Sequence, residues 1–506
     1  MPIQIINYNL FTSALNLLSF QTIVICIEIH RSFRIAAMKN FSITGTYTDL
    51  YQLTMAQVYF LTGKQNNEAV FDYFFRKIPF EGGYAVFAGL ADLLQVLEEL
   101  RFTKDDVAYL KEIGLNAQFA NSLEGFRFKG TVYAMNEGEI IFPNEPVLRL
   151  EGNILEAQIV ETMLLNILNF QSLIATKAAR MRSVAGDRIL SEFGLRRSQG
   201  LGGYHATRAT FVGGFNSTSN VKAALDFGIP VVGTMAHSFI QSFDDELSAF
   251  RAFALHRPEN CVLLVDTYDT LKSGLPNAIT VAKEMLQRSH RLSGIRLDSG
   301  DLAYLSIQAR KMLDAAGLQD VTITVSNQLD EWTIKSLLDQ HAPIDVFGVG
   351  TSLVTAPPDA AMDGVYKLAF SDGKPRIKLS ENLKKITLPD KKQVYRMRND
   401  AGKFAGADVI ALHDEKSPTI MYHPLEPDKS LSLKGMMQEA LLAKVMEKGK
   451  ILPDHPSLLE TAAYCQQRLK MLPDEHKRFY NPHVYKIGIS EHLRDERNQL
   501  KNKYKV

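Results

Sequence analysis

The sequence predicts an α/β protein organised around a (β/α) barrel. The first observation is an alternation, in the middle third of the chain, of short β-branched runs with helical segments, which is typical of parallel βαβ units. The second is that polar residues and glycines gather directly after these runs. Barrel proteins carry their functional groups at the carboxyl ends of their strands, so both observations favour the same architecture.

The composition is that of an ordinary folded protein. The chain has 506 residues, enough for about three domains, with 46% hydrophobic and 22% charged residues. These values argue against wholesale disorder and against a polytopic membrane protein. The formal charge of +1 gives no global signature for nucleic acid or an anionic membrane. Cys26, Cys261 and Cys465 lie far apart without CxxC spacing, so we expect no disulfide framework and a reducing, cytoplasmic setting.

The amino-terminal segment has a different residue pattern from the rest of the chain. Residues 14–27 are apolar but interrupted by Asn16, Gln21 and Thr22, and they fall short of the ~20 residues of a membrane-spanning helix. The first basic residues follow this stretch, whereas a secretory signal carries them ahead of it. We therefore interpret residues 1–37 as an extension that the fold does not use, with the globular sequence starting at Met38.

The segment before the barrel mixes helices and antiparallel strands. DLYQLTMAQVYFL (49–61) and LADLLQVLEELRF (90–102) have apolar residues at helical spacing. Between them, residues 69–89 predict a strand followed by a glycine turn. Residues 126–150 alternate and contain Gly and Pro, which favours short antiparallel strands. A long helix is expected from about Leu155 to Val184.

Seven strand candidates define the barrel, and several are followed by helical segments such as residues 246–255 and 302–317. The strand candidates are RILSEF (188–193), ATFVGG (209–214), IPVVGT (229–234), CVLLVDT (261–267), GIRLDS (294–299), VTITVS (321–326) and IDVFGV (344–349). After about residue 363 the chain becomes rich in strands and turns. We interpret the lysines of residues 374–397 as a solvated face rather than a polyanion site.

The residues that follow the predicted strands are unusually polar. They are Phe193-Gly194-Leu195-Arg196-Arg197, Asn216-Ser217-Thr218-Ser219, Gly233-Thr234-Met235-Ala236-His237, Asp266-Thr267-Tyr268-Asp269, Arg296-Leu297-Asp298-Ser299-Gly300-Asp301, Ser326-Asn327 and Gly348-Val349-Gly350-Thr351. Each alone has an ordinary explanation, such as a helix cap or an exposed arginine. Together they suit a phosphorylated, magnesium-bound substrate.

Two of these groups have a specific chemistry. Gly348 and Gly350 allow close approach of the backbone to a phosphate, and Thr351 adds a hydroxyl, late in the barrel where a phosphate is commonly held. Four carboxylates, Asp266, Asp269, Asp298 and Asp301, follow two consecutive strands. They are candidates for holding ribose hydroxyls, Mg²⁺ or both.

Eight motifs, in order, resemble the nicotinate phosphoribosyltransferase family. They are TDLYQLTM (48–55), EFGLRR (192–197), GGFNSTSN (213–220), GTMAHSF (233–239), VDTYDT (265–270), RLDSGDL (296–302), SNQLDE (326–331) and GVGT (348–351). The resemblance spans about residues 45–400, continues weakly in residues 481–490 and excludes residues 1–37. One departure is Pro389-Asp390, where the family often has Pro-Gly.

The resemblance implies a fold and an activity. The fold is a (β/α) barrel-like type II phosphoribosyltransferase core with a smaller α+β domain built from the N- and C-terminal parts. We expect an N-terminal domain over 38–185, the barrel over 186–362 and a C-terminal segment over 363–506. The reaction is ATP-dependent transfer of phosphoribosyl from 5-phosphoribosyl 1-diphosphate to nicotinate, giving nicotinate mononucleotide and diphosphate for NAD synthesis. A homodimer with active sites near the subunit boundary is also implied, with no nucleic acid or membrane partner.

The resemblance and the chemistry together assign roles to individual residues. His237, which the family phosphorylates with ATP, and Asp298 are expected to be catalytic. Nicotinate binding is expected for Tyr51, Phe193, Thr234 and Arg296, with Phe193 stacking on the ring or belonging to the core. 5-Phosphoribosyl 1-diphosphate is expected to meet Arg196, Asp266, Ser326, Asn327, Gly348, Gly350 and Thr351. Mg²⁺ is expected to arrive with the substrate, near Asp266 and Asp298.

Other functions share parts of this pattern. The nearest is nicotinamide phosphoribosyltransferase, whose members carry an acidic residue in the turn where this chain has Ser219. An aldolase-like or isomerase barrel is a second alternative, although a Schiff-base aldolase needs a strand-end lysine and these positions carry none. A non-catalytic nucleotide sensor is a third, but it predicts eroded motifs and these are intact.

Overall fold

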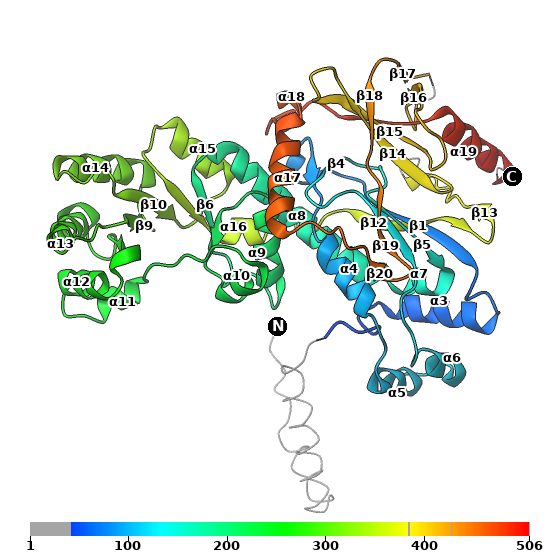
Figure 1. Ribbon diagram of the computed structural model, residues 1–506, viewed down its shortest axis with the longest axis horizontal. Helices are drawn as coiled ribbons and strands as arrows, with labels where there is room; N and C mark the ends of the chain where they lie inside the picture. Colours follow the sequence, from blue (N-terminus) through cyan, green and yellow to red (C-terminus); the bar gives the residue numbers. More distant parts are fainter. Residues whose placement is uncertain (1–41, 383–384, 427, 505–506) are drawn as a thin grey trace, which may run out of the picture.

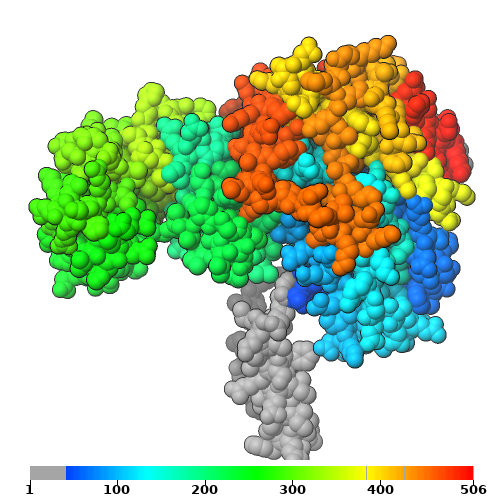
Figure 2. All heavy atoms as spheres, viewed as in Figure 1, coloured from blue at the N-terminus to red at the C-terminus, as the bar shows by residue number. Residues whose placement is uncertain are grey.

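The computed structural model describes residues 42–382, 385–426 and 428–504, and the predicted extension at 1–37 lies outside them. The molecule has two lobes (Figure 1). The barrel lobe, drawn in green, runs from strand β6 to helix α16, and the larger lobe combines both ends of the described chain. Figure 2 shows the barrel lobe as a mass extending from one side of the molecule.

The barrel lobe is built on a six-stranded parallel sheet in the order β7-β6-β11-β10-β9-β8. Its strands are β6 (Ile189–Glu192), β7 (Ser217–Thr218), β8 (Val262–Leu264), β9 (Gly294–Leu297), β10 (Thr322–Ser326) and β11 (Val346–Val349). This order follows the chain around a circle, as in a (β/α) barrel, but strands β7 and β8 are not paired with each other. The inner positions of the strands are buried, for example Ile295, Val325 and Phe347.

Helices connect these strands. They are α9 (Gly202–Val212), α10 (Val221–Phe227), α11 (His237–Gln241), α12 (Glu246–His256), η3 (Thr270–Gly274), α13 (Leu275–Gln287), α14 (Leu302–Ala315), α15 (Glu331–Asp339) and α16 (Thr351–Val354). Several begin at an aspartate or asparagine that caps them, such as Asp245, Asp301 and Asp330.

Two of the seven expected strands differ from the prediction. Residues 209–214 were expected as a strand, but they form the end of helix α9 and its cap, and the short β7 takes the strand's place. The expectation is wrong because a short apolar run does not distinguish a buried helix from a strand, and Ala209, Thr210 and Phe211 are buried. Residues 229–234 contribute only an isolated bridge between Val231 and Thr218.

The larger lobe contains a seven-stranded sheet in the order β13-β12-β1-β5-β3-β19-β20. Strands β1 (Glu68–Phe75), β3 (Thr131–Ala134) and β5 (Leu148–Asn153) come from the N-terminal segment. Strands β12 (Gly364–Ser371), β13 (Lys374–Pro375), β19 (Ala443–Glu447) and β20 (Lys450–Ile451) come from the C-terminal one. Because β1 pairs with both β12 and β5, the two ends of the chain form one sheet, which bears out the fold class.

Helices of the N-terminal segment accompany this sheet. The expected helices appear as α3 (Leu50–Leu61) and α4 (Leu90–Glu99), followed by α5 (Lys104–Glu112) and α6 (Ala117–Ser122). The long helix expected at 155–184 is divided at Val160 into α7 (Ile154–Ile159) and α8 (Glu161–Ala185). Helix α7 packs on β1 and β5, and α8 packs on α9 and α15 of the barrel lobe.

A second, six-stranded sheet is formed by the C-terminal segment in the order β17-β16-β21-β15-β14-β18. Its strands are β14 (Lys392–Arg398), β15 (Phe404–Leu412), β16 (Ile420–Tyr422), β17 (Ser430–Ser432), β18 (Met437–Ala440) and β21 (Lys486–Ile489). Asp390, at the departure from the family pattern, has φ 63°, a left-handed conformation that glycine adopts freely and aspartate tolerates. Among the described helices, none is long and apolar enough to cross a membrane.

Candidate active site

The two expected carboxylates Asp266 and Asp298 meet at the ends of strands β8 and β9. Asp266 Oδ2 accepts hydrogen bonds from the backbone N–H of Asp298, at 2.8 Å, and from the Ser299 hydroxyl, at 2.6 Å. Its Oδ1 is buried and has no partner in the described chain. One oxygen of Asp266 therefore ties the two strand ends together, while the other remains available to a ligand hydroxyl or cation.

The other two carboxylates have structural roles. Asp269 accepts from the backbone N–H groups of Leu271 and Lys272 and caps η3. Asp301 accepts from the N–H of Tyr304 and caps α14. Of the four carboxylates that follow β8 and β9, Asp269 and Asp301 thus cap helices, and Asp266 and Asp298 remain as the candidates for a ligand.

Arg296 lies on β9 next to this pair. Its Nη1 donates to the Thr234 hydroxyl, which confirms that the segment after residue 229 reaches the same rim. Its Nε is buried without a partner in the described chain. Burial lowers the pKa of the Arg296 guanidinium, and the carboxylates of Asp298 and Asp266 act in the opposite direction. A half-buried guanidinium with a buried, unsatisfied donor is suited to bind a carboxylate.

His237 is the first residue of α11 and points to the same carboxylates. Its Nδ1 is 3.0 Å from the Thr267 hydroxyl, and its Nε2 is 3.9 Å from Asp298 Oδ2. Its side chain is 38% exposed. The imidazole is therefore held on one side and accessible on the other.

The GVGT segment ends β11 and starts α16. A Cβ at Gly348 would lie 2.4 Å from the ring of Phe193, so the half-buried Phe193 ring rests against this glycine. Gly350 has φ −120°, outside the left-handed region, and a side chain at this position is restricted by the Phe193 carbonyl oxygen, which a Cβ would approach to 3.1 Å. Thr351 is exposed at the first turn of α16, whose N–H groups have no intrahelical acceptor.

Ser326 and Asn327 end β10 beside this segment. The buried Ser326 hydroxyl donates to Asp298 Oδ1, so its first partner in the protein is the carboxylate rather than a phosphate. Asn327 is exposed with φ 76°, which turns the chain sharply at the strand end. Arg196 is exposed in the loop after β6.

Two residues of the rim were not singled out from the sequence. Glu192 is fully buried, and its carboxylate accepts from the hydroxyls of Thr207 and Thr218 and from the N–H of Gly194, thereby holding the loop that carries Phe193 and Arg196. Thr267 contacts His237. Glu192 could have been found as a charged residue inside an apolar strand, whereas the Thr267 contact depends on the loop after β8.

Tyr51 is not brought to this rim within one chain. It lies on α3, at the far side of the larger lobe from strands β9 and β10 (Figure 1), and its side chain is exposed. Burial, followed by the charges of Glu161 and Asp49, raises the pKa of its phenol. Glu161 is also 3.7 Å from Lys367 Nζ on β12, so Tyr51 belongs to a polar cluster of the larger lobe.

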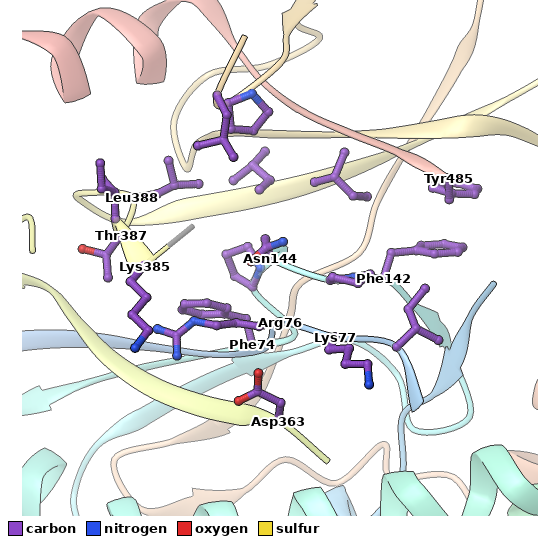
Figure 3. Close-up of a pocket in the computed structure, with 18 of the residues that line it drawn as sticks. Phe74, Arg76, Lys77, Phe142, Asn144, Asp363, Lys385, Thr387, Leu388 and Tyr485 are labelled. Atoms are coloured by element: carbon purple, nitrogen blue, oxygen red, sulfur yellow. The ribbon is translucent and has the colours of Figure 1, made fainter. Parts of the chain in front are cut away.

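That lobe also contains a cavity of about 670 Å³ between its two sheets. Figure 3 shows Arg76, Lys77 and Asp363 on one side of it and Phe142 and Tyr485, whose rings stack at 3.6 Å, on another. Its basic lining residues are Arg76, Lys77, Lys367, Lys385, Lys392, Arg497 and Lys501, against two carboxylates, Asp72 and Asp363. None of the expected site residues lines it.

In the described part of the chain, no group of three or more His, Cys, Asp or Glu is arranged to hold a metal ion. Asp266 and Asp298 alone supply too few ligands for Mg²⁺, which takes six oxygens and commonly obtains several from substrate phosphates and water. The residues present therefore fit a cation delivered together with a phosphorylated substrate.

The chain is similar to known proteins over most of its length. The family model described as the nicotinate phosphoribosyltransferase (NAPRTase) family matches residues 189–402, and the models of its N-terminal and C-terminal domains match residues 46–169 and 391–497. The chain is 45% identical over 455 residues to the nicotinate phosphoribosyltransferase of Bacillus subtilis (strain 168), covering 88% of this chain and 92% of that protein. It is 38% identical over 522 residues to the Dictyostelium discoideum protein of the same name, covering 91% and 89%.

The solved structures show the same likeness. The crystal structure of human nicotinic acid phosphoribosyltransferase superimposes with a TM-score of 0.81 at 33% identity, over 90% of this chain and 99% of that one. The similarity thus extends over both lobes.

Proposed function

The chain belongs to the nicotinate phosphoribosyltransferase family, and from that premise we propose that the rim around Arg296, Asp298 and His237 is its active site. The enzyme transfers phosphoribosyl from 5-phosphoribosyl 1-diphosphate to nicotinate and forms nicotinate mononucleotide and diphosphate in NAD biosynthesis. One observation carries the assignment of the site: the buried, unpartnered Nε of Arg296, which Thr234 holds in place.

Arg296 gives a physical reason for the choice of nicotinate. A guanidinium binds the nicotinate carboxylate with two parallel, charge-assisted hydrogen bonds, whereas the neutral amide of nicotinamide offers a single weaker acceptor. Thr234 holds Nη1 and leaves the other donors for the ring substituent. Tyr51 and Phe193 complete the proposed ring site. The nicotinamide alternative is not favoured.

The transfer step needs charge stabilisation and alignment. Positive charge develops at the anomeric carbon while diphosphate leaves with negative charge, so fixed charges and positioning carry the rate. We assign Arg196 to the phosphate or diphosphate groups, and Gly348, Gly350, Thr351 and Asn327 to the 5-phosphate. Asp266 Oδ1 is suited to a ribose hydroxyl or Mg²⁺, and Asp298, which Ser326 orients, to the developing positive charge. Bound Mg²⁺ would neutralise the departing diphosphate.

Product analysis tests this function. The purified chain, given nicotinate and 5-phosphoribosyl 1-diphosphate, should form nicotinate mononucleotide and diphosphate in equal amounts by chromatography. Release of diphosphate without the mononucleotide would show that the ribose is transferred to water and would contradict the assignment.

We propose that ATP phosphorylates His237 during turnover. The supporting observation is the partly exposed His237 side chain beside Asp298, since neutral imidazole is nucleophilic near pH 7. Incubation with ATP labelled at the γ-phosphate should give an acid-labile, base-stable phosphoenzyme. His237→Ala should lose both the label and the stimulation by ATP while slow transfer continues. Label on the variant would contradict the role of His237.

We also propose a homodimer in which Tyr51 of one subunit reaches the rim of the other. The support is the position of α3 away from the barrel strands and the exposed apolar side chains on both lobes, namely Leu50, Val58 and Leu61 on α3 and Leu195, Leu201, Val221 and Leu225 on the barrel lobe. Mixing Tyr51→Ala chains with His237→Ala chains, which retain only slow transfer, should restore ATP-stimulated activity through mixed dimers. A monomer by analytical ultracentrifugation, or no recovery of activity in the mixture, would contradict the proposal.

A reducing, cytoplasmic setting is supported by the buried free thiols of Cys261 and Cys465.

A further inference from the structure

We propose that Thr267 is the positioning residue that engages Nδ1 of His237 and thereby directs phosphorylation to Nε2. The inference rests on the proposed phosphorylation of His237 and adds which nitrogen reacts and which residue decides it. Thr267 follows β8 and Asp266, on a strand end adjacent to the one that carries Asp298.

The two ring nitrogens of His237 have different surroundings. Nδ1 lies 3.0 Å from Thr267 Oγ1, within hydrogen-bond distance. Nε2 lies 3.9 Å from Asp298 Oδ2, too far for a hydrogen bond, and no described residue hydrogen-bonds it. Because Thr267 engages Nδ1, Nε2 is the ring nitrogen left for an incoming phosphoryl group on a side chain that is 38% exposed.

The loop that carries Thr267 is held in place by its neighbours. Asp269 caps η3 through its side chain, and its carbonyl accepts from the N–H groups of Ser273 and Gly274. On the other side, the N–H of Val265 donates to the carbonyl of Arg296, which fixes the end of β8 against β9. Thr267 is half-buried, and within the described chain its hydroxyl makes a side-chain hydrogen bond to His237 alone. A fixed loop with one hydroxyl aimed at Nδ1 orients the ring.

Attack from Nε2 uses the tautomer with the proton on Nδ1, and the Thr267 hydroxyl oxygen can accept that proton in a hydrogen bond. With the proton on Nδ1 and donated to Thr267 Oγ1, the lone pair is on Nε2. This lone pair attacks the γ-phosphorus of the nucleoside triphosphate, so an Nε2–P bond forms and the bond from that phosphorus to the bridging oxygen breaks. The nucleoside diphosphate leaves with the bonding electron pair. The Nδ1 proton stays in its bond to Thr267 during attack and passes to water when the phosphoimidazole becomes neutral.

Three variants test the role of Thr267. Thr267→Val keeps the volume and removes the hydroxyl, Thr267→Ser keeps the hydroxyl, and Thr280→Val makes the same change at an exposed helical site, where the hydroxyl bonds only the Pro276 carbonyl. Each full-length chain is incubated with γ-labelled ATP. The rate of labelling is measured, and the phosphohistidine isomer is identified in base by phosphorus NMR against the two authentic isomers.

The expected wild-type product is the Nε2 isomer. Thr267→Val should label roughly tenfold more slowly or distribute label between both nitrogens, because the ring loses its orienting bond. Its Michaelis constant for nicotinate should be unchanged. Thr267→Ser and Thr280→Val should behave like the wild type.

Several results would overturn the inference. Wild-type label on Nδ1 alone would refute it while leaving phosphorylation of His237 intact, whereas no label at all would refute the phosphorylation itself. Wild-type labelling rate and isomer in Thr267→Val would remove Thr267 from the mechanism. If Thr267→Val does not fold, the wild-type isomer and the labelling rate of Thr267→Ser still test the inference, and a Thr267→Ser chain that takes no label although it keeps the hydroxyl would contradict the role of that hydroxyl.

Discussion

The barrel rim and the interior of the larger lobe use charged residues in opposite ways. In the larger lobe, Arg396 is fully buried and donates to Asp408, Glu139 and the carbonyl of Ile140, so its guanidinium is satisfied by the protein. At the rim, Arg296 and Asp266 are each held by the protein through some of their polar atoms, while Nε and Oδ1 remain buried and unpartnered. The charge of Arg396 is thus neutralised by other residues of the protein, whereas Arg296 and Asp266 each retain an unsatisfied atom at the rim that we propose binds ligand.

This difference has an energetic cause. A buried charge without a partner costs far more than one in an ion pair, so an unsatisfied atom lowers stability until a ligand satisfies it. Changes in the Arg396 cluster should therefore affect stability and spare catalysis in the remaining folded molecules. Changes at the rim should do the reverse.

The largest effect is expected for Arg396→Met. It leaves Asp408 buried without its cation and removes one of the two arginines that contact Glu139, and it should lower the free energy of unfolding by about 3–5 kcal/mol. Denaturant unfolding measures it. Lys222→Met, at an exposed pair with Asp226, is the control and should leave the midpoint nearly unchanged. An Arg396→Met chain as stable as the wild type would contradict the statement that the Arg396 cluster stabilises the larger lobe.

Arg296→Lys should show the opposite behaviour. Lysine cannot form the two parallel hydrogen bonds to nicotinate, so the Michaelis constant for nicotinate should rise roughly 10–100-fold with little change in melting temperature. Arg291→Lys, at an exposed ion pair of the same lobe, should have no such effect. An unchanged Michaelis constant would remove Arg296 from the ring site.

Substitutions in GVGT should have a smaller effect on stability. Gly348→Ala places a Cβ against the Phe193 ring, at a cost of about 1 kcal/mol, the low end for overpacking because the ring can shift. Gly350→Val should greatly weaken binding of 5-phosphoribosyl 1-diphosphate, because its side chain would press on the Phe193 carbonyl and displace the turn that we propose holds the phosphate. Calorimetric titration measures how tightly the two variants bind 5-phosphoribosyl 1-diphosphate. Normal binding by Gly350→Val would mean that GVGT is an ordinary turn and not a phosphate site.

The smallest effect concerns Glu496, which lies in the larger lobe but has a buried, unpartnered Oε2 like the rim residues. Burial, followed by the charge of Asp390, raises the pKa of Glu496 from 4.5 to about 7. The folded chain therefore holds a proton that the unfolded chain releases between pH 4.5 and 7, so the contribution of Glu496 to stability falls as the pH rises across this window and is lost above it. Melting temperatures of wild type and Glu496→Gln at pH 5 and 8 measure it. If the melting temperature of the wild type falls no more than that of the variant between pH 5 and 8, Glu496 does not cause the pH dependence.

The sequence predicted the barrel strands best where a β-branched run ended in a polar motif, as at CVLLVDT, GIRLDS and IDVFGV. It failed at residues 209–214, because a buried helix facing the core has no polar face to reveal its period. The residue types at the rim were predictable from their positions after strands. Their partners were not, since the contacts of Asp266 with Ser299, and of His237 with Thr267, depend on loop geometry. Tyr51 was found through the family motif, and only the structure shows its distance from the other site residues.

The substrate preference tests the central claim most directly. With 5-phosphoribosyl 1-diphosphate and ATP present, diphosphate release is measured with nicotinate and with nicotinamide, for the wild type and for Arg296→Lys. We predict that wild-type kcat/KM is at least about 100-fold higher for nicotinate, as expected for a site with a buried charged group that only one substrate satisfies, and that Arg296→Lys narrows the gap. Equal or better turnover of nicotinamide by the wild type would contradict the account.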